Sequence, residues 1–367
     1  MNQREQKIKA FDPNGVGHPN GNLFGLPFTP EESGVIVIPV PWDVTASFRR
    51  GAANGPAAIL EASYQIDLYD EDVPGAWKTG IAMPSIPSRW QESNDQLSKK
   101  AAEVILRLEK GEGIDSATKE LQKEVNLGCQ TMVSEVSAIA AHWIQKGKLV
   151  GVLGGDHSTA LGLMHALRER YSKYGVLHID AHFDLRDAFE GLEYSHASIM
   201  RNARDLEALK GDTLGWAISC FVHAGIRDYC DEELEAIAAQ ENRHVVFTER
   251  QIRRQLFEGS SWKSITDKMI RNLPDWVYVS FDIDGLDPSL CPNTGTPVPG
   301  GFNLEEVFYL ISRVVDSGRK IIGFDLCEVA PASTHRNDWA GDWNANVGMR
   351  VLYRLSALVA RSCSLTQ

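Results

Sequence analysis

The sequence Val176-Leu177-His178-Ile179-Asp180-Ala181-His182-Phe183-Asp184 begins as an apolar run typical of a buried strand and ends in three side chains that can bind a metal. In an extended chain, side chains two residues apart lie on one face, so Asp180, His182 and Asp184 can converge where the strand ends. Two carboxylates and an imidazole that face one point are poorly satisfied by one another, whereas a divalent cation stabilises them together. The stretch therefore predicts a buried strand that leads into a metal site. A solvated turn at a strand end is the alternative.

Segments with strand character alternate with segments of helical character along the remaining chain. Strands are expected at 35–40, 149–153, 175–180, 219–225, 244–247, 277–282 and 320–326, and helices at 57–64, 95–109, 115–146, 159–171, 232–240, 262–272, 304–317 and 345–360. This alternation predicts an α/β fold with a mostly parallel central sheet between two helical layers. No repeat or linker divides the chain, so we expect one domain over 34–367. Residues 1–33, rich in Gly, Pro and Asn, are expected to form an arm on the body or on a neighbouring subunit.

Composition limits the classes of partner. The chain has 367 residues and a formal net charge of -12, without a basic run, which argues against nucleic-acid binding. Its six cysteines are scattered and form no C-x-x-C pair, which indicates a reducing compartment without a disulfide framework or a thiolate zinc site. The N-terminus carries no apolar leader, and no run reaches membrane-spanning length. We therefore expect a cytoplasmic protein with no membrane partner.

Polar clusters follow four of the expected strands. Gly154-Gly155-Asp156-His157-Ser158 follows one strand, Asp180 to Asp184 follow the next, Asp282-Ile283-Asp284-Gly285-Leu286-Asp287-Pro288 follows a third and Glu328 follows a fourth. Carboxyl ends of parallel strands meet at one sheet edge, where open α/β sheets place their ligand crevice. We expect the four clusters to lie together there.

Six side chains in these clusters are suited to metal binding, two imidazoles and four carboxylates: His157, Asp180, His182, Asp184, Asp282 and Asp284. This number exceeds the need of one catalytic cation with an open position, but it suits two cations bridged by carboxylates and a water. Oxygen and nitrogen ligands without thiolate favour Mn²⁺, with Ni²⁺, Co²⁺ or Zn²⁺ as alternatives.

The Gly-Gly-Asp-His-Ser, Asp-Ala-His-Phe-Asp and Ser280–Pro288 motifs, in this order, resemble the three signatures of the ureohydrolase family. That family includes arginase, agmatinase, guanidinobutyrase, formimidoylglutamase and guanidine hydrolase. The resemblance runs from about Val35 to the C-terminal helix. It includes Arg50-Gly51-Ala52 to Gly55-Pro56, Gly225-Ile226-Arg227-Asp228 and Glu328-Val329-Ala330-Pro331. It implies an arginase-like three-layer αβα fold, trimers or hexamers, and a dinuclear-metal hydrolase that cleaves a C–N bond of a guanidino group to release urea.

The resemblance also implies a role for each site residue. One metal would be bound by His157, Asp180, Asp184 and Asp282, and the other by His182, Asp180, Asp282 and Asp284. Asp184 would also orient the bridging hydroxide, Glu328 would hold the substrate guanidinium, and His196 in Tyr194-Ser195-His196-Ala197-Ser198 falls where the family has a proton-shuttling histidine. Chemistry supports these roles, because a cationic substrate needs a fixed carboxylate, and a departing amine needs a proton from a group such as a histidine with a near-neutral pKa.

The substrate is less clearly indicated. Arginase has small polar residues downstream of the second motif, where this chain has Arg186 followed by charged residues, and His196-Ala197 replaces the His-Gly of better-known agmatinases. Arg186 at the mouth would suit a carboxylate tail and disfavour a second cation, unless Asp187 or Glu190 neutralises it, while free guanidine needs no tail recognition. Agmatinase-like and guanidine-hydrolase-like activities both stay open, with formimidoylglutamase or guanidino-acid hydrolase behind them.

Two other protein classes are alternatives. A deacetylase-like amidohydrolase of similar fold uses a single zinc held by two Asp and one His, and the additional His157, Asp184 and Asp284 argue against it. A non-catalytic binding relative should have lost ligands, and this chain keeps all of them. Trp339 and Trp343, after Glu328, are candidates for either packing or the pocket wall.

Overall fold

The structure, a computed structural model, describes residues 3–207, 209, 215–240 and 242–365. Within these residues, eight strands form one sheet in the order β2-β1-β3-β8-β7-β4-β5-β6, and every neighbouring pair is parallel. The strands are β1 (Val35–Val40), β2 (Ile81–Ala82), β3 (Leu149–Gly154), β4 (Tyr174–Ile179), β5 (Ile218–Ala224), β6 (His244–Phe247), β7 (Trp276–Asp282) and β8 (Lys320–Cys327).

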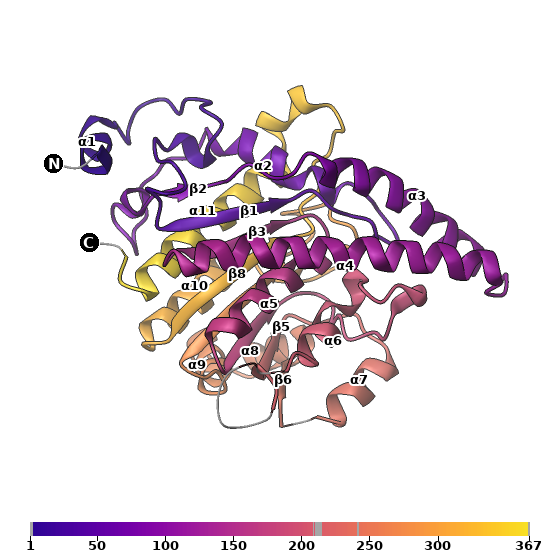
Figure 1. Cartoon of the computed structure of the whole chain (residues 1–367). Helices are drawn as coiled ribbons and strands as arrows, with labels where there is room; N and C mark the ends of the chain where they lie inside the picture. The colour runs from indigo at the N-terminus through magenta and orange to yellow at the C-terminus, as the bar shows by residue number, and fades with distance from the viewer. Residues whose placement is uncertain (1–2, 208, 210–214, 241, 366–367) are drawn as a thin grey trace.

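Helices cover both faces of this sheet (Figure 1). The helices are α1 (Gln3–Ala10), α2 (Gly55–Ser63), α3 (Arg89–Glu109), α4 (Ser116–Gln145), α5 (Leu161–Arg170), α6 (Ile199–Arg204), α7 (Asp231–Ala238), α8 (Glu249–Phe257), α9 (Trp262–Arg271), α10 (Leu304–Asp316) and α11 (Trp343–Ser362). Apolar residues of α3, α4, α5 and α6 share one core cluster, and those of α2, α8, α9, α10 and α11 share the other. The expected three-layer αβα fold is confirmed. Among the described helices, none combines the length and apolar character needed to cross a bilayer.

Strand β1 shows why these apolar runs are continuous rather than alternating. All six of its residues are buried. Val35 and Val37 pack in one core cluster, while Ile36, Ile38 and Val40 pack in the other. Each face of the strand therefore meets a helical layer, and burying each such side chain stabilises the fold by roughly 1.5–3 kcal/mol.

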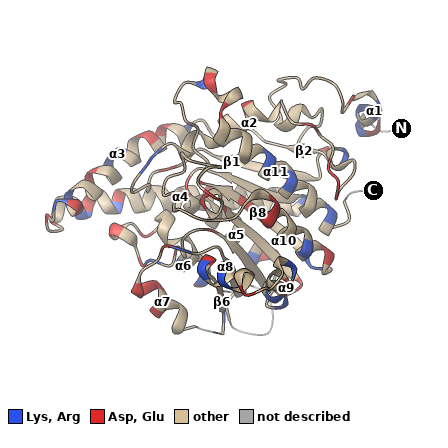
Figure 2. Ribbon diagram, turned by 180° about the vertical axis from the view of Figure 1, so that it is seen from behind, with Lys and Arg blue, Asp and Glu red and all other residues tan. Residues whose placement is uncertain are grey.

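Helices α3 and α4 form a long hairpin that extends beyond the sheet (Figure 1). The Asp115 side chain caps α4 by accepting a hydrogen bond from the Thr118 backbone N–H at 2.7 Å. Val125, Cys129 and Met132 are buried at helical spacing and face the sheet layer. Basic and acidic residues are interspersed along the hairpin of α3 and α4 (Figure 2). Amphipathicity therefore identified both helices correctly.

Residues 3–33 lie against the body of the protein. Leu23 and Leu26 are fully buried in the core, and Lys7 pairs with Glu32 at 2.6 Å. Helix α1 was not expected, although its sequence lacks Gly and Pro and is rich in good helix formers. That 1–33 is an arm separate from a domain over 34–367, or contacts a neighbouring subunit, stays a prediction.

Three further elements, β2, α6 and α8, were also missed. Helix α6 has only six residues, too few for a helical pattern. Strand β2 has only two residues, too few for a hydrophobic pattern. Helix α8 begins with a capping box, in which the Gln251 N–H donates to Thr248 Oγ1 at 3.2 Å and the Thr248 N–H donates to Gln251 Oε1 at 3.1 Å. The spacing of Thr248 and Gln251 was a readable start signal for this helix.

Gly155 follows β3 directly and packs against the backbone of Trp42, so replacing it with alanine should destabilise the protein. A Cβ atom there would lie 1.8 Å from the Trp42 carbonyl oxygen, so the backbone would have to move. We expect Gly155→Ala to lower the free energy of unfolding by about 1–3 kcal/mol, measured by urea denaturation. Gly113→Ala is the control, because a Cβ atom there meets nothing within 4 Å. Equal stability of the two variants would contradict this account.

Candidate active site

The four polar clusters follow β3, β8, β7 and β4, which are consecutive neighbours in the sheet. All strands are parallel, so their carboxyl ends lie at one edge and the clusters meet there. Five of the six expected metal ligands are buried, and His182 is partly exposed. The four polar clusters therefore lie together at one edge of the sheet, as expected from the strand ends.

His157 is the centre of the first group. Its Nδ1 atom lies 3.0 Å from Asp184 Oδ2, 3.2 Å from Asp180 Oδ2 and 3.4 Å from Asp282 Oδ2. An imidazole nitrogen carries at most one proton, so it cannot satisfy three carboxylates at once. The geometry surrounds one ring nitrogen with anions.

The other ring nitrogen of His157 fixes which tautomer faces these anions. Its Nε2 atom lies 2.9 Å from Ser280 Oγ, and the Ser280 hydroxyl donates to Asp325 Oδ2 at 2.8 Å. Because the hydroxyl proton is used, Nε2 must donate to Ser280. Burial lowers the pKa of His157, but hydrogen bonds to Asp180 and Asp184 outweigh it and raise this pKa well above its ordinary value, so Nδ1 holds a proton among the carboxylates. Loss of that proton would leave a lone pair that repels them. A divalent cation between them removes this repulsion, so the donor set fits a metal.

His182 forms a second group with the same bridging carboxylate. Its Nδ1 atom lies 3.2 Å from Asp284 Oδ2 and 3.6 Å from Asp180 Oδ1. Asp180 thus offers one oxygen to each histidine. The ligand atoms of Asp180, His182 and Asp284 lie within 4.8 Å of one another, as do those of His157, His178, Asp180 and Asp184.

Crowding of like charges raises the pKa values of two carboxyl groups in this site. Burial, followed by the charges of Asp284 and Asp180, raises the pKa of Asp282 well above its ordinary value. Burial and Asp180 also raise the pKa of Asp184 to about 6. Carboxylates packed this closely are stabilised when cations lie among them.

Two of the site residues have a left-handed backbone. Asp184 has φ 55° and Glu328 has φ 63°, conformations that cost a non-glycine residue roughly 1–3 kcal/mol. The Asp184 carbonyl accepts hydrogen bonds from the N–H groups of Met200 and Arg201, and the Glu328 N–H donates to the Gly155 carbonyl at 2.8 Å. These contacts hold both turns in place.

The Glu328 side chain contacts the backbone of His157. Its Oε1 atom accepts a hydrogen bond from the His157 backbone N–H at 3.0 Å. Burial, followed by the charge of Asp156, raises the pKa of Glu328 well above its ordinary value. A cation arriving beside this carboxyl would favour its charged form.

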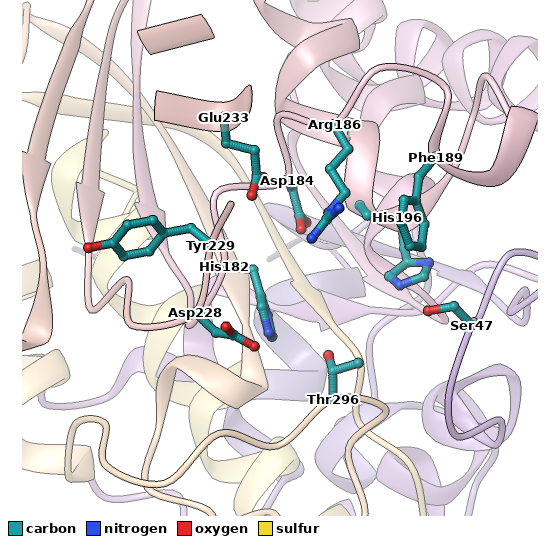
Figure 3. A pocket seen from close by; sticks show the side chains of 11 residues that line it. Ser47, His182, Asp184, Arg186, Phe189, His196, Asp228, Tyr229, Glu233 and Thr296 are labelled. Carbon is teal, nitrogen blue, oxygen red and sulfur yellow. The ribbon is translucent and has the colours of Figure 1, made fainter. Parts of the chain in front are cut away.

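A pocket opens in front of His182 and Asp184 (Figure 3). Its lining residues are Ser47, His182, Asp184, Arg186, Phe189, His196, Ala197, Asp228, Tyr229, Glu233 and Thr296. The Arg186 guanidinium lies over the Phe189 ring at 4.8 Å from its centroid. Arg186 was expected at the mouth of the site, whereas the wall formed by Phe189, Asp228 and Tyr229 was not. The motif that ends at Asp228 was the one signal for this wall in the sequence.

His196 lines this same pocket and begins a short 3-10 turn. Its backbone N–H donates to Thr45 Oγ1 at 3.0 Å, and its buried Nδ1 atom has no hydrogen-bond partner among the described residues. Burial, followed by the charge of His182, lowers the pKa of His196 to about 4. This differs from the near-neutral value expected from the sequence, because burial is a property of the folded chain. The ring is therefore neutral at pH 7.

The two tryptophans after Glu328 take different positions. Trp339 is buried and its Nε1 donates to the Ser333 carbonyl, whereas Trp343 is 54% exposed and its Nε1 donates to the Ser289 carbonyl at 3.0 Å. Neither is among the residues described around the pocket in Figure 3. Their role in the site therefore rests on packing of the surrounding loops.

A model of the arginase family matches residues 33–356. The chain belongs to the arginase family. N(1)-aminopropylagmatine ureohydrolase from Thermus thermophilus is 32% identical over 310 residues, covering 84% of this chain and 87% of the relative. The enzyme of that name from Synechocystis is 30% identical over 301 residues, covering 82% of each.

Solved structures of this family have the same fold. Proclavaminate amidinohydrolase from Streptomyces clavuligerus superimposes with a TM-score of 0.67 at 26% identity, covering 93% of this chain and 97% of that one. Agmatine ureohydrolase from Thermoplasma volcanium gives 0.66 at 21% identity, which shows the fold alone. As an arginase-family ureohydrolase, the chain is a hydrolase that acts on C–N bonds of amidines.

The position of Asp180 predicts how many metal ions each variant binds. We expect two Mn²⁺ per wild-type chain, none in Asp180→Asn, because both groups share its carboxylate, and one in Asp284→Asn. Metal content after gel filtration gives these numbers. Asp287→Asn is the control and should keep two, because Asp287 Oδ1 caps the Ser289 N–H outside both groups. Two bound ions in Asp180→Asn would show that this residue does not bridge.

Proposed function

We propose that the chain is a dinuclear-metal ureohydrolase that splits a guanidino substrate with water into urea and an amine, as an agmatinase does. The observation that carries the proposal is the His157 Nδ1 atom, which faces three carboxylate oxygens within 3.4 Å, together with the two-sided placement of Asp180. One ion would be held by His157, Asp180, Asp184 and Asp282, and the other by His182, Asp180, Asp282 and Asp284. Mn²⁺ suits this donor set best, with Ni²⁺ or Co²⁺ as alternatives.

The metal pair would supply a water whose pKa is lowered to about 7, and a poor electrophile such as a guanidinium carbon requires such an activated nucleophile. Asp184, whose carboxylate faces the first group, would orient that water. Glu328 would anchor the guanidinium by paired hydrogen bonds. Two metal dications would repel this cation, so a fixed carboxylate is needed to hold it.

His196 would move the proton that the leaving amine requires. Its Nδ1 atom lies in the pocket wall without a partner among the described residues, and the ring is neutral at pH 7. The ring can therefore take up a proton at Nδ1 and deliver it to the departing nitrogen. A permanently charged histidine could not perform the first half of this transfer.

Charges around Arg186 bear on the choice of substrate. Asp187 pairs with Arg201 at 2.8 Å, so it does not neutralise Arg186. Glu190 interacts electrostatically with Arg186, but burial and Glu109 raise the pKa of Glu190. Neither Asp187 nor Glu190 therefore fully neutralises the positive charge of Arg186 at the pocket wall.

An agmatinase-like activity is supported by the names of several relatives, among them an agmatinase from Bacillus anthracis that is 26% identical. Asp228, on the wall near His182, would meet the amine of such a substrate (Figure 3). Guanidine hydrolysis to urea and ammonia is the alternative, because the stacked pair Arg186 and Phe189 narrows the pocket and guanidine has no tail. A guanidino acid or formiminoglutamate would instead use Arg186 to bind its carboxylate.

Single-zinc deacetylase chemistry and a non-catalytic binding role are disfavoured by the second histidine–carboxylate group. We further propose a cytoplasmic homo-trimer or homo-hexamer. Each of the six cysteines is free, which suits a reducing compartment. Light scattering gives the molar mass and checks the assembly.

A substrate panel tests the activity and the role of Arg186 together. Guanidine, agmatine, 4-guanidinobutyrate, arginine and formiminoglutamate are assayed for urea or formamide after Mn²⁺ or Ni²⁺ loading, and we expect urea from a guanidino compound. In Arg186→Met, KM should fall about tenfold for agmatine and rise about tenfold for 4-guanidinobutyrate, since each corresponds to about 1.4 kcal/mol of lost repulsion or attraction. KM for guanidine should not change. Release of formamide alone, or of no product, would refute the ureohydrolase.

Substitution of His196 should slow turnover without loss of metal. We expect His196→Ala to lower kcat by about 100-fold, the usual contribution of a positioned proton donor, while the Mn²⁺ content stays that of the wild type. Glu328→Gln is the contrasting variant and should mainly raise KM, because it weakens guanidinium binding. Unchanged turnover in His196→Ala would remove this residue from the mechanism.

A further inference from the structure

Three buried histidines form a continuous chain behind Asp180. His178 Nε2 lies 2.7 Å from Asp180 Oδ2, His178 Nδ1 lies 2.9 Å from His223 Nδ1, and His223 Nε2 lies 3.0 Å from His244 Nδ1. His178 and His223 are fully buried, and His244 is 6% exposed. The chain thus runs from the proposed metal centre to the edge strand of the sheet.

Strand register places the three rings on one face. His178 of β4 pairs with His223 of β5, and His244 of β6 lies two residues before Val246, the partner of His223. Residues two apart on a strand share a face, so the rings meet across three neighbouring strands. Phe221 stacks on His244 with ring centroids 5.0 Å apart at 9°, which restrains the last ring.

Hydrogen-bond chemistry gives the chain one direction. The ionised Asp180 can only accept, so His178 donates from Nε2, and a ring that carries this one proton accepts at Nδ1. His223 then donates from Nδ1 and accepts at Nε2, and His244 donates from Nδ1. The buried His244 Nε2 atom is left as an unprotonated acceptor, and it has no hydrogen-bond partner among the described residues.

The pKa values of His223 and His244 agree with neutral rings at these two positions. Burial is the main cause that lowers the pKa of His223 well below its ordinary value. Burial and Arg243 lower the pKa of His244 to about 4. His223 and His244 therefore each have one donor and one acceptor at pH 7, as a directed chain requires.

We infer that His223 and His244 are positioning residues that fix Asp180 through His178 and thereby raise the affinity of the site for divalent cations. The inference rests on the proposed metallohydrolase. Asp180 Oδ1 is held by the backbone N–H of His182 at 2.6 Å, whereas Oδ2 is held by His178. Without a donor at His223, the His178 proton could move to Nδ1, and its Nε2 lone pair would then repel the carboxylate that faces both metal groups.

Mn²⁺ affinity, measured on the full-length protein by competition with a chelating dye, tests this inference. We expect His223→Phe and His244→Phe to weaken Mn²⁺ binding by about tenfold or more, the usual effect of removing a residue that orients a ligand, with the larger loss at His223. His244→Asn should restore affinity to within about threefold of wild type, because its amide N–H can replace the Nδ1 donor.

Phe221→Leu is the matched control. It disturbs the ring packing beside His244 but leaves every hydrogen bond of the chain in place, so its Mn²⁺ affinity should stay that of the wild type. An equal loss in Phe221→Leu and His244→Phe would show that packing is the cause and overturn the inference. So would unchanged affinity in His244→Phe, or failure of His244→Asn to restore it.

Nitrogen NMR of the metal-free protein provides a readout that packing alone does not produce. With ¹⁵N-labelled histidine, His178 should be protonated at Nε2 and His223 and His244 at Nδ1, and His244→Phe should shift the His178 tautomer. A His178 signal protonated at Nδ1 in the wild type would overturn the directed chain. Neither measurement uses a substrate, so absence of urea release would refute the proposed activity without altering these results.

Discussion

Four buried carboxylates share one site with two imidazoles, and the rest of the structure supports this concentration of negative charge. Moving a single carboxylate from water into a protein interior costs several kcal/mol unless a counter-charge is present. In this chain the two imidazoles of the site cannot balance its four carboxylates even when both rings are protonated, because each ring carries at most one positive charge. Divalent cations would complete the balance, and they would explain why so many anions can be folded into one place.

The sheet supplies the framework for this arrangement. Each motif is carried by a strand that is buried on both faces, so the apolar burial that stabilises the strand also fixes the position of its last residues. The left-handed backbones of Asp184 and Glu328 are tolerated because the surrounding hydrogen bonds hold them. Apolar burial between the sheet and its helical layers thus stabilises the fold and offsets the unfavourable backbone conformations at the strand ends.

The sequence predicted the parts of the molecule that depend on local pattern. Apolar runs followed by polar clusters located the motif-bearing strands, and convergence of their ends followed from parallel pairing. The six candidate ligands lie close together, and their role as metal ligands stays a prediction. What depends on long-range burial was missed. The pocket wall of Phe189 and Tyr229, the low pKa of His196 and the link between His223 and His244 require knowledge of which loops and strands pack together.

The pocket wall suggests why relatives in this family differ in substrate although the chemistry is shared. The groups that face the reacting carbon would treat any guanidinium alike, whereas Arg186 and Asp228, which line the same pocket, would also meet a substrate tail. A cationic tail about 6 Å from Arg186 would be opposed by roughly 3 kcal/mol at an effective dielectric constant of 20, and Asp228 would return a similar amount. In the proposed enzyme, the balance between these two side chains would decide whether a tail is bound or rejected. A tail-free guanidine is indifferent to both, so it is the substrate against which the others are best compared.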